Sequence, residues 1–281
     1  MNKTIEINGL SLFYREAGQQ NKETILFLHG NPTSSHMYKE LMNLLKDDYH
    51  VIAPDYPGFG FSSRPGIDEY EYSFDNISHT INQFIDTLKL NNFYLFVQDY
   101  GGPIGFRIAN QRPELIKGLI IQNANTYLEG LGEWAIEIGG YIQNNDLEKM
   151  NTYKKHLVSL AGLKEQYITG AKDTSLIDPS SYYLDYAFLQ RSGVQELFLT
   201  LFDNYGTNFE KYEEWQNYLR TYQPPTLVVW GTNDKFFNKH GGEAYAKDLK
   251  DVQLHFFDGG HFMLEEYNAD VALLIKKFIS K

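Results

Sequence analysis

Asp99 is the residue of this sequence with the clearest capacity for covalent chemistry. It follows the apolar run 93–97 and precedes Tyr100, Gly101 and Gly102, a pattern that predicts a buried strand, a tight turn and a helix. Such a turn needs small neighbours and lifts its central side chain clear of the sheet. A carboxylate presented there can attack a carbon that bears a leaving group and form an ester. The simpler interpretation of Asp99 is a helix N-cap.

Two later motifs supply an acid and a base. The apolar run 226–230 leads to Asp234, and the apolar run 252–257 leads to His261. Strands of one parallel sheet would bring Asp99, Asp234 and His261 together in the chain order nucleophile, acid, histidine. His261 would activate water to hydrolyse the ester, and Asp234 would fix the imidazole tautomer and stabilise the imidazolium. We therefore expect these three residues to be catalytic.

Each partner also has a simpler interpretation, and the acid has an alternative position. His261 could be a structural histidine in a Gly-Gly-His turn, and Asp234 could cap a loop or helix. Some enzymes place the acid after the sixth strand, but segment 121–125 has no carboxylate there, and Glu129 comes several residues later. Asp234 is therefore the better candidate.

At these residues the chain resembles the α/β-hydrolase superfamily, and within it the aspartate-nucleophile branch of haloalkane dehalogenases and epoxide hydrolases. The resemblance includes the loop His29-Gly30-Asn31-Pro32 and the segment 53–62, and it is weakest between residues 126 and 222. It implies an α/β-hydrolase fold: a mostly parallel central sheet with helices on both faces and an inserted helical cap. It also implies a hydrolase that needs no cofactor.

The resemblance assigns leaving-group and oxyanion roles to Asn31 and Tyr100. Their backbone N–H groups would form the oxyanion hole. Dehalogenases bind the departing halide with the asparagine that matches Asn31 and with a tryptophan directly after the nucleophile. Here that tryptophan is replaced by Tyr100, whose hydroxyl donates from a different place. Trp134 is a possible donor from the cap, although hydrophobic packing is its simpler interpretation.

Three functions remain open at this point. Asn31 favours dehalogenase-like cleavage of carbon–halogen bonds in small neutral substrates, which is our first expectation. Epoxide opening is the alternative, since in epoxide hydrolases cap tyrosines protonate the departing alkoxide. The third is a non-catalytic binding protein on the same fold, because function depends on the site and not on the fold. A serine esterase is disfavoured, since no serine occupies position 99.

The remaining histidines are expected to have structural roles. His29 belongs to the loop after the first buried strand and is expected to hydrogen-bond within it. The others lack an evident carboxylate partner in the sequence; they are His36, His50, His79, His156, His240 and His255.

The spacing of apolar residues predicts the elements that position the site. Asn8-Gly9 between alternating residues predicts an opening hairpin. Strands and helices then alternate, which indicates a mostly parallel sheet whose carboxyl ends gather the reactive groups. After strand 24–28, the expected elements are helix 35–46, strand 51–53, helix 75–90, strand 93–97, helix 102–111 and strand 118–122.

The strand–helix alternation stops at about residue 126 and resumes at Pro224-Pro225. We expect residues 1–125 and 223–281 to form the core domain and residues 126–222 to form the cap, inserted after the sixth strand. Helices are expected at 146–160 and 194–204. The cap is rich in tyrosines, of which one or two would line a pocket: Tyr127, Tyr141, Tyr153, Tyr167, Tyr182, Tyr183, Tyr186, Tyr205, Tyr212, Tyr218 and Tyr222.

Composition limits the possible partners. The formal charge of −11 would repel the phosphates of nucleic acid and the head groups of an anionic membrane. The 281 residues include no cysteine, which excludes disulfides, thiolate chemistry and cysteine-bound zinc. No metal or nucleotide motif is present. The first residues lack a signal-peptide core, and we expect a cytoplasmic protein that acts on a small neutral organic substrate and water. The sequence does not indicate the oligomeric state.

Overall fold

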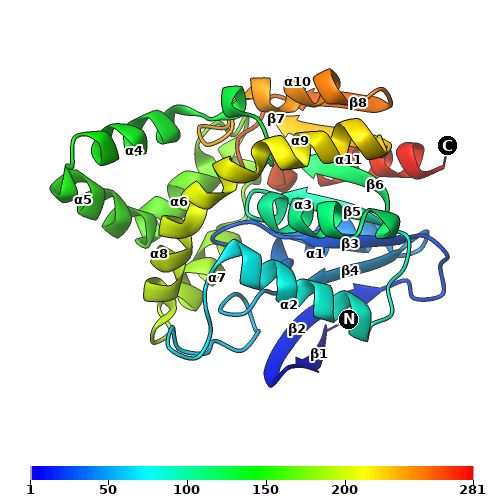
Figure 1. The fold of residues 1–281 in the computed structure, drawn as a ribbon, viewed down its shortest axis with the longest axis horizontal. Helices are drawn as coiled ribbons and strands as arrows, with labels where there is room; N and C mark the ends of the chain where they lie inside the picture. The colour runs from blue at the N-terminus through cyan, green and yellow to red at the C-terminus, as the bar shows by residue number, and fades with distance from the viewer. Residues whose placement is uncertain (1, 281) are drawn as a thin grey trace.

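A computed structural model describes residues 2–280, which form one eight-stranded sheet with helices on both faces (Figure 1). The order across the sheet is β1-β2-β4-β3-β5-β6-β7-β8; β1 and β2 are antiparallel to their neighbours, and the remaining pairs are parallel. The predicted fold class is confirmed. The strands are β1 (Asn2–Ile7), β2 (Leu10–Ala17), β3 (Thr24–Leu28), β4 (His50–Pro54), β5 (Phe93–Gln98), β6 (Ile116–Gln122), β7 (Thr226–Gly231) and β8 (Val252–Phe257).

The opening hairpin forms as its turn sequence predicts. Ile7 pairs with Leu10 across a two-residue turn. Asn8 and Gly9 both adopt positive φ, 50° and 81°, the geometry of the type I′ turn that asparagine followed by glycine favours.

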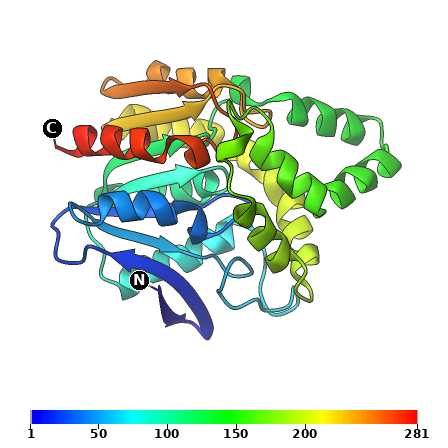
Figure 2. The same ribbon diagram turned by 180° about the vertical axis from the view of Figure 1, so that it is seen from behind.

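Helices cover the sheet in two layers. One face carries α2 (Phe74–Thr87), α3 (Gly101–Gln111), α9 (Tyr212–Tyr222) and α10 (Lys239–Asp248), seen in front in Figure 1. The other face carries α1 (Lys39–Leu45) and α11 (Leu264–Ile279), seen in front in Figure 2. A 3-10 turn, η1 (Ser35–Tyr38), precedes α1, and another, η2 (Pro113–Leu115), precedes β6. The inner strands β5 and β7 are buried along their whole length, as strands covered on both faces must be.

Between β6 and β7 the chain forms a helical layer over one end of the sheet (Figure 1). Its helices are α4 (Glu133–Gln143), α5 (Leu147–Leu157), α6 (Leu160–Ile168), α7 (Pro179–Leu189) and α8 (Val194–Asn204), with 3-10 turns η3 (Leu128–Gly130), η4 (Thr174–Leu176) and η5 (Tyr205–Lys211).

The expected helix 146–160 is interrupted, because Ser159 caps a new helix: its hydroxyl oxygen accepts from the Gly162 N–H at 3.0 Å. The expected helix 194–204 coincides with α8. Although α9 lies within segment 126–222, it packs on α3 of the core, with the Trp215 ring stacked on Phe106 at 5.7 Å. The last helix of the insertion, α9, therefore packs on the same face of the sheet as α2 and α3.

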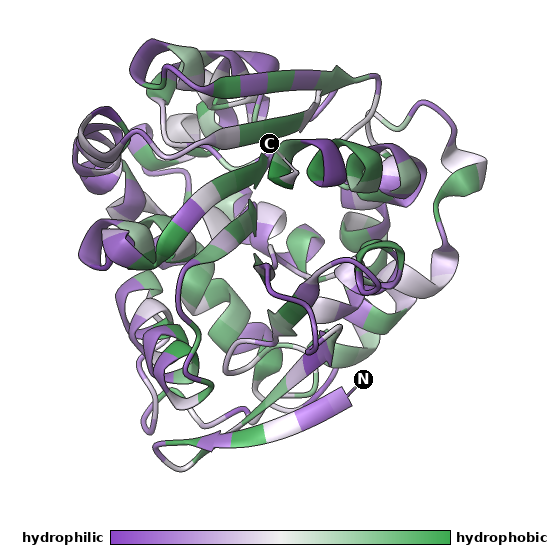
Figure 3. Ribbon diagram, turned by 90° about the vertical axis from the view of Figure 1, so that its right-hand side faces the viewer, coloured by the Kyte–Doolittle hydropathy of each residue, from purple (hydrophilic) through white to green (hydrophobic). Residues whose placement is uncertain are grey.

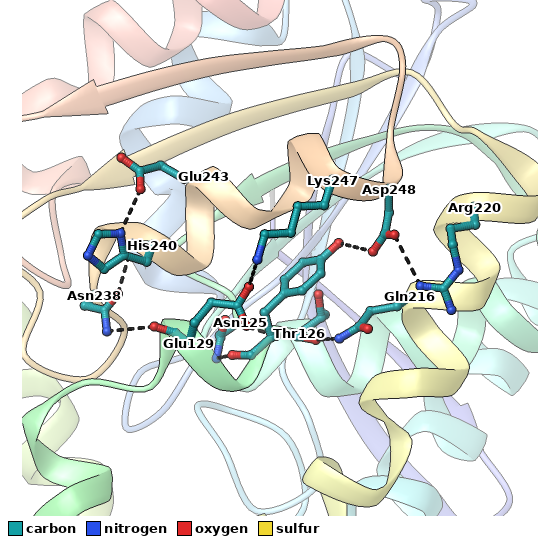
Figure 4. Close-up of polar contacts among 11 residues, drawn as sticks. Asn125, Thr126, Glu129, Gln216, Arg220, Asn238, His240, Glu243, Lys247 and Asp248 are labelled. Carbon is teal, nitrogen blue, oxygen red and sulfur yellow. Dashed lines mark hydrogen bonds and ion pairs between the residues drawn. The ribbon is translucent and has the colours of Figure 1, made fainter.

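Polar contacts join the start of this helical layer to α9 and α10 (Figure 4). The Lys247 ammonium of α10 pairs with the Glu129 carboxylate, and the Asn238 side chain donates to the Glu129 carbonyl at 3.0 Å. On the α9 side, the Gln216 amide donates to the Thr126 carbonyl at 2.8 Å. These contacts fix the direction in which the chain leaves β6 and enters the helical layer.

Figure 3 shows hydrophobic residues concentrated on the central strands, with hydrophilic residues mainly on the surrounding helices and loops. Side chains of β3, β5 and β7 are almost all buried, so the core lies on both faces of the inner sheet. Within residues 2–280, none of the helices combines the length and the apolar character needed to cross a bilayer.

Candidate active site

Asp99 occupies a tight turn between β5 and α3. Its φ is +48°, in the left-handed region that few residues other than glycine and asparagine adopt readily. The N-cap of α3 is Tyr100, so Asp99 does not cap the helix. A side chain at Gly101 would place its Cβ 2.0 Å from the Leu28 carbonyl oxygen. The turn therefore requires glycine after position 100, and it holds the Asp99 side chain out from the sheet.

Backbone N–H groups hold the Asp99 carboxylate. The Asn31 N–H donates to Oδ1 at 2.7 Å, and the Tyr100 N–H also donates to this carboxylate. Gly30 permits the close approach, because a Cβ there would lie 2.5 Å from the Asp99 Cβ. The two donors expected to form an oxyanion hole thus meet at the Asp99 carboxylate, whose Oδ2 faces His261.

His261 connects the nucleophile to the acid. Its Nε2 lies 3.6 Å from Asp99 Oδ2, and its Nδ1 lies 2.7 Å from Asp234 Oδ2. Asp234 also accepts from the Phe236 N–H at 2.7 Å and from the Asn123 amide at 2.8 Å. With these donors the carboxylate fixes the imidazole so that Nε2 points at the nucleophile. The structure therefore brings together all three residues predicted to be catalytic.

Burial and nearby charges shift the pKa values of Asp99 and His261. Burial raises the pKa of Asp99, and the His261 charge and the backbone donors only partly offset it. For His261, burial lowers the pKa, but the charge and hydrogen bond of Asp234 and the charge of Asp99 outweigh it, so that its pKa is raised. The imidazole therefore holds a proton to higher pH while Asp99 is ionised.

Asp99 and His261 open into a small cavity of about 40 Å³, which has space for a few water molecules. Its wall is mainly aromatic and aliphatic, and it comes from both the core and the helical layer. The lining residues are Asn31, Asp99, Tyr100, Trp134, Tyr153, Leu157, Gln166, Phe202, Tyr205, Phe236, Phe237 and His261.

The structure corrects the expected role of Trp134. Its ring lines the cavity, but the indole N–H donates to the Phe236 carbonyl oxygen at 2.6 Å. An indole has one donor and no acceptor, so Trp134 has none left for a leaving group. Asn31 and Tyr100 do line the cavity beside Asp99, and the Asn31 side-chain oxygen is buried without a partner among residues 2–280.

Sequence reasoning did not identify several residues of the site. Asn123 at the end of β6 and Gln98 at the end of β5 both contact the triad; the Gln98 amide nitrogen lies 3.1 Å from His261 Nε2. Their positions at strand ends were an available signal. Gln166 of α6 gave no signal, because the sequence does not show which side of a cap helix meets the cavity.

The expectation that one or two cap tyrosines line a pocket agrees with the structure. Two of the eleven, Tyr153 and Tyr205, line the cavity that contains Asp99. The Tyr205 hydroxyl hydrogen-bonds with that of Tyr212, and the Asp99 charge acts on Tyr205 directly, raising its pKa together with burial, which is the larger effect.

The expectation that the other histidines lack carboxylate partners is wrong for four of them. Three of the partners lie on another element of the fold, and the fourth, Glu243, lies three residues after His240 on the same helix. These pairs are His36 with Asp185, His50 with Glu16, His156 with Glu165 and His240 with Glu243, all at 2.7 or 2.8 Å. None of these pairs lines the cavity. His29 accepts from the Tyr56 N–H at 3.4 Å and is fully buried, as a structural loop residue should be.

No group of three or more metal-ligating side chains is found in the part of the chain that the structure describes.

Comparison with known proteins identifies relatives along nearly the full length. Residues 23–150 and 171–267 match the alpha/beta hydrolase fold family. An uncharacterized hydrolase of Saccharomyces cerevisiae is 39% identical, covering 94% of this chain and 92% of its own. A cis-3-alkyl-4-alkyloxetan-2-one decarboxylase of Shewanella oneidensis is 29% identical (98% and 86%). A haloalkane dehalogenase of Psychrobacter cryohalolentis is 26% identical (98% and 89%).

Proposed function

The chain belongs to the α/β-hydrolase fold family, and on that premise we propose that it is a hydrolase whose nucleophile is Asp99 and whose substrate is a small neutral epoxide. The observation that carries this proposal is the cavity that Asp99 and His261 share with Tyr153 and Tyr205. It combines a nucleophile, a base and two phenols in an otherwise largely apolar space.

The first step forms the ester. Asp99 Oδ2 attacks a ring carbon, the carbon–oxygen bond breaks, and the departing alkoxide takes a proton from a tyrosine. Oδ1 keeps its hydrogen bond from the Asn31 N–H, and the Tyr100 N–H also donates to the carboxyl group. The attack needs no base, because the carboxylate is already the nucleophilic form.

The second step hydrolyses the ester. His261 takes a proton from water, and the hydroxide attacks Cγ of Asp99. The negative charge then develops on Oδ1, where the Asn31 and Tyr100 donors stabilise it. Collapse breaks the bond to the alkyl oxygen. Of the two water protons, one completes the diol and the other returns to the tyrosinate, so the sum is epoxide plus water giving diol.

The donors around Asp99 support an oxygen leaving group over a halide. Position 100 holds tyrosine, and the indole N–H of Trp134 is donated to a backbone carbonyl, so neither position offers an indole donor to a halide. A halide leaves without a proton, whereas an alkoxide requires one. Tyr153 and Tyr205 supply phenols, which burial keeps protonated by raising their pKa.

The test is diol formation from 1,2-epoxypentane, with halide release from bromoalkanes of similar length measured in parallel. We expect diol formation, and we expect Tyr205→Phe and Tyr153→Phe each to lower its kcat by roughly 10- to 100-fold. Tyr183→Phe is the matched control, because Tyr183 is an exposed cap tyrosine outside the cavity. Full diol formation by the Tyr153→Phe/Tyr205→Phe double variant would contradict the assignment of the acid.

Carbon–halogen cleavage by the same ester mechanism is the second candidate. It is supported by the position of Asn31, whose side chain carries amide donors and lines the cavity beside Asp99, and by the likeness to haloalkane dehalogenases. Bromide release without diol formation would select it. Inactivity on both substrate panels would instead favour a non-catalytic binding role.

A further inference from the structure

Gln166 is a polar group of the cavity that the proposed reaction does not use. Its side chain comes from α6 and lines the cavity. The residue is only 5% exposed, and its amide nitrogen has no hydrogen-bond partner within residues 2–280. Leaving a buried amide unpaired is costly. An occupant of the cavity that carries a suitably placed acceptor would supply the missing partner.

The end of α6 is fixed against the loops that carry the triad. The Asn233 amide donates to the Gly170 carbonyl at 3.1 Å. A Cβ on Gly260 would come within 2.1 Å of the Thr169 carbonyl oxygen, so the backbone of α6 and the loop before His261 are in close contact. Gln166 is thus held in a set position relative to the reacting atoms, which reduces the cost of ordering it on binding.

The neighbours of Gln166 in the cavity define what it can recognise. Leu157 and Phe202 line the same cavity from cap helices, and Phe236 and Phe237 line it from the core. An alkyl epoxide would leave the Gln166 amide facing hydrocarbon. A substrate with a suitably placed oxygen would accept a hydrogen bond from it. Sites of this kind reject the analogue that lacks the polar atom.

We propose that Gln166 binds a substrate oxygen outside the reacting ring, and that the enzyme selects epoxides with an ether, hydroxyl or carbonyl oxygen a few bonds from the ring. The small cavity limits the distance between ring and oxygen. This inference rests on the proposed function, because it takes Tyr153 and Tyr205 as the groups that serve the ring oxygen.

Two substrates of equal length test it. Methyl glycidyl ether and 1,2-epoxypentane differ only by an ether oxygen in place of a methylene. We expect Gln166→Met, which keeps the length and removes the amide, to lower kcat/KM for methyl glycidyl ether and raise it for 1,2-epoxypentane. The ratio of the two kcat/KM values should fall by about 5- to 100-fold relative to wild type. Because the same two epoxides are used with both proteins, the difference in their intrinsic reactivity cancels when the wild-type and variant ratios are compared.

Gln143→Met is the matched control. Gln143 is an exposed glutamine at the end of α4, so its variant should keep the wild-type ratio. Gln166→Met with an unchanged ratio would overturn the proposal. So would an equal fall for both substrates with an unchanged melting temperature, since that would indicate a role in placing water.

A binding measurement separates this inference from the proposed function. Titration of wild type and Gln166→Met with 3-methoxypropane-1,2-diol and pentane-1,2-diol requires no turnover. If wild type opens neither epoxide, the proposed function fails. Loss of a wild-type preference for the methoxy diol in Gln166→Met would still support the role of Gln166, and equal binding of both diols by both proteins would refute it.

Discussion

Replacing His261 by alanine should stop the reaction after its first step and trap the ester on Asp99. Ester formation depends on Asp99 Oδ2, and the hydrogen bonds that the carboxylate accepts from the Asn31 and Tyr100 N–H groups do not involve the imidazole. Hydrolysis depends on a base beside the ester carbonyl. Asp99 and His261 are the one carboxylate and the one imidazole among the residues that line the cavity, so the variant has no substitute base.

The size of the effect follows from the loss of general-base catalysis, which contributes about 10²- to 10⁴-fold. Hydrolysis should slow by that factor while ester formation persists. Because the His261 charge lowers the pKa of Asp99, its removal raises that pKa further, and ester formation by the variant should therefore be measured at a higher pH than for the wild type. Under these conditions the ester should accumulate to one per protein.

Intact mass measured after exposure to 1,2-epoxypentane should increase by the mass of the epoxide, and peptide mapping should place the addition on Asp99. The control is the same variant combined with Asp99→Asn, since asparagine also tolerates the positive φ of this turn. An unmodified His261→Ala protein with demonstrated substrate binding would refute the covalent mechanism. An addition that persists with Asp99→Asn would refute Asp99 as the nucleophile.

Three further predictions follow from the donors and charges of the site. Asn31→Ala keeps its backbone N–H, so we expect a loss of about 1.5–3 kcal/mol in transition-state stabilisation for carbon–halogen cleavage but much less for epoxide opening; equal losses would show that Asn31 shapes its loop. Tyr100→Trp should add an indole donor and raise bromide release in a dehalogenase, yet leave diol formation flat or lower in an epoxide hydrolase; parallel assays of one variant decide between them. Esterification removes the Asp99 charge that helps to raise the pKa of His261. The pKa of the acid limb of the kcat–pH profile should therefore be lower than the His261 pKa measured by NMR in the free enzyme. Equal pKa values from the two measurements would count against an ester intermediate.

The triad and the sheet could be predicted because both leave local signals. A strand buried on two faces must be a continuous apolar run, and the turn after it must contain small residues. In a parallel sheet these turns meet at one edge, so residues as far apart as Asp99, Asp234 and His261 needed only their order to be associated. The structure places them within hydrogen-bonding or near-contact distances.

The contacts of the helical cap could not be predicted in the same way. Whether Tyr153 or Tyr183 lines the cavity depends on how α5 and α7 are rotated over the core, which the sequence pattern of a cap helix does not specify. The partner of His36 is Asp185, 149 residues later, and such a contact leaves no local pattern. The direction of the Trp134 indole depends on the Phe236 carbonyl in another loop.

That backbone carbonyl also limits how readily this site could be converted to halide release. Tyr100→Trp can restore a donor directly after the nucleophile, but the N–H of Trp134 remains bonded to the Phe236 carbonyl, which no side-chain substitution removes. The Phe236 N–H in turn donates to Asp234, so moving this loop to release Trp134 would also disturb the acid that orients His261. A second indole donor therefore cannot be gained without weakening the base. By contrast, the Tyr205 hydroxyl, which is hydrogen-bonded to that of Tyr212, needs only to turn about its C–O bond to donate to an alkoxide, and the triad does not have to move.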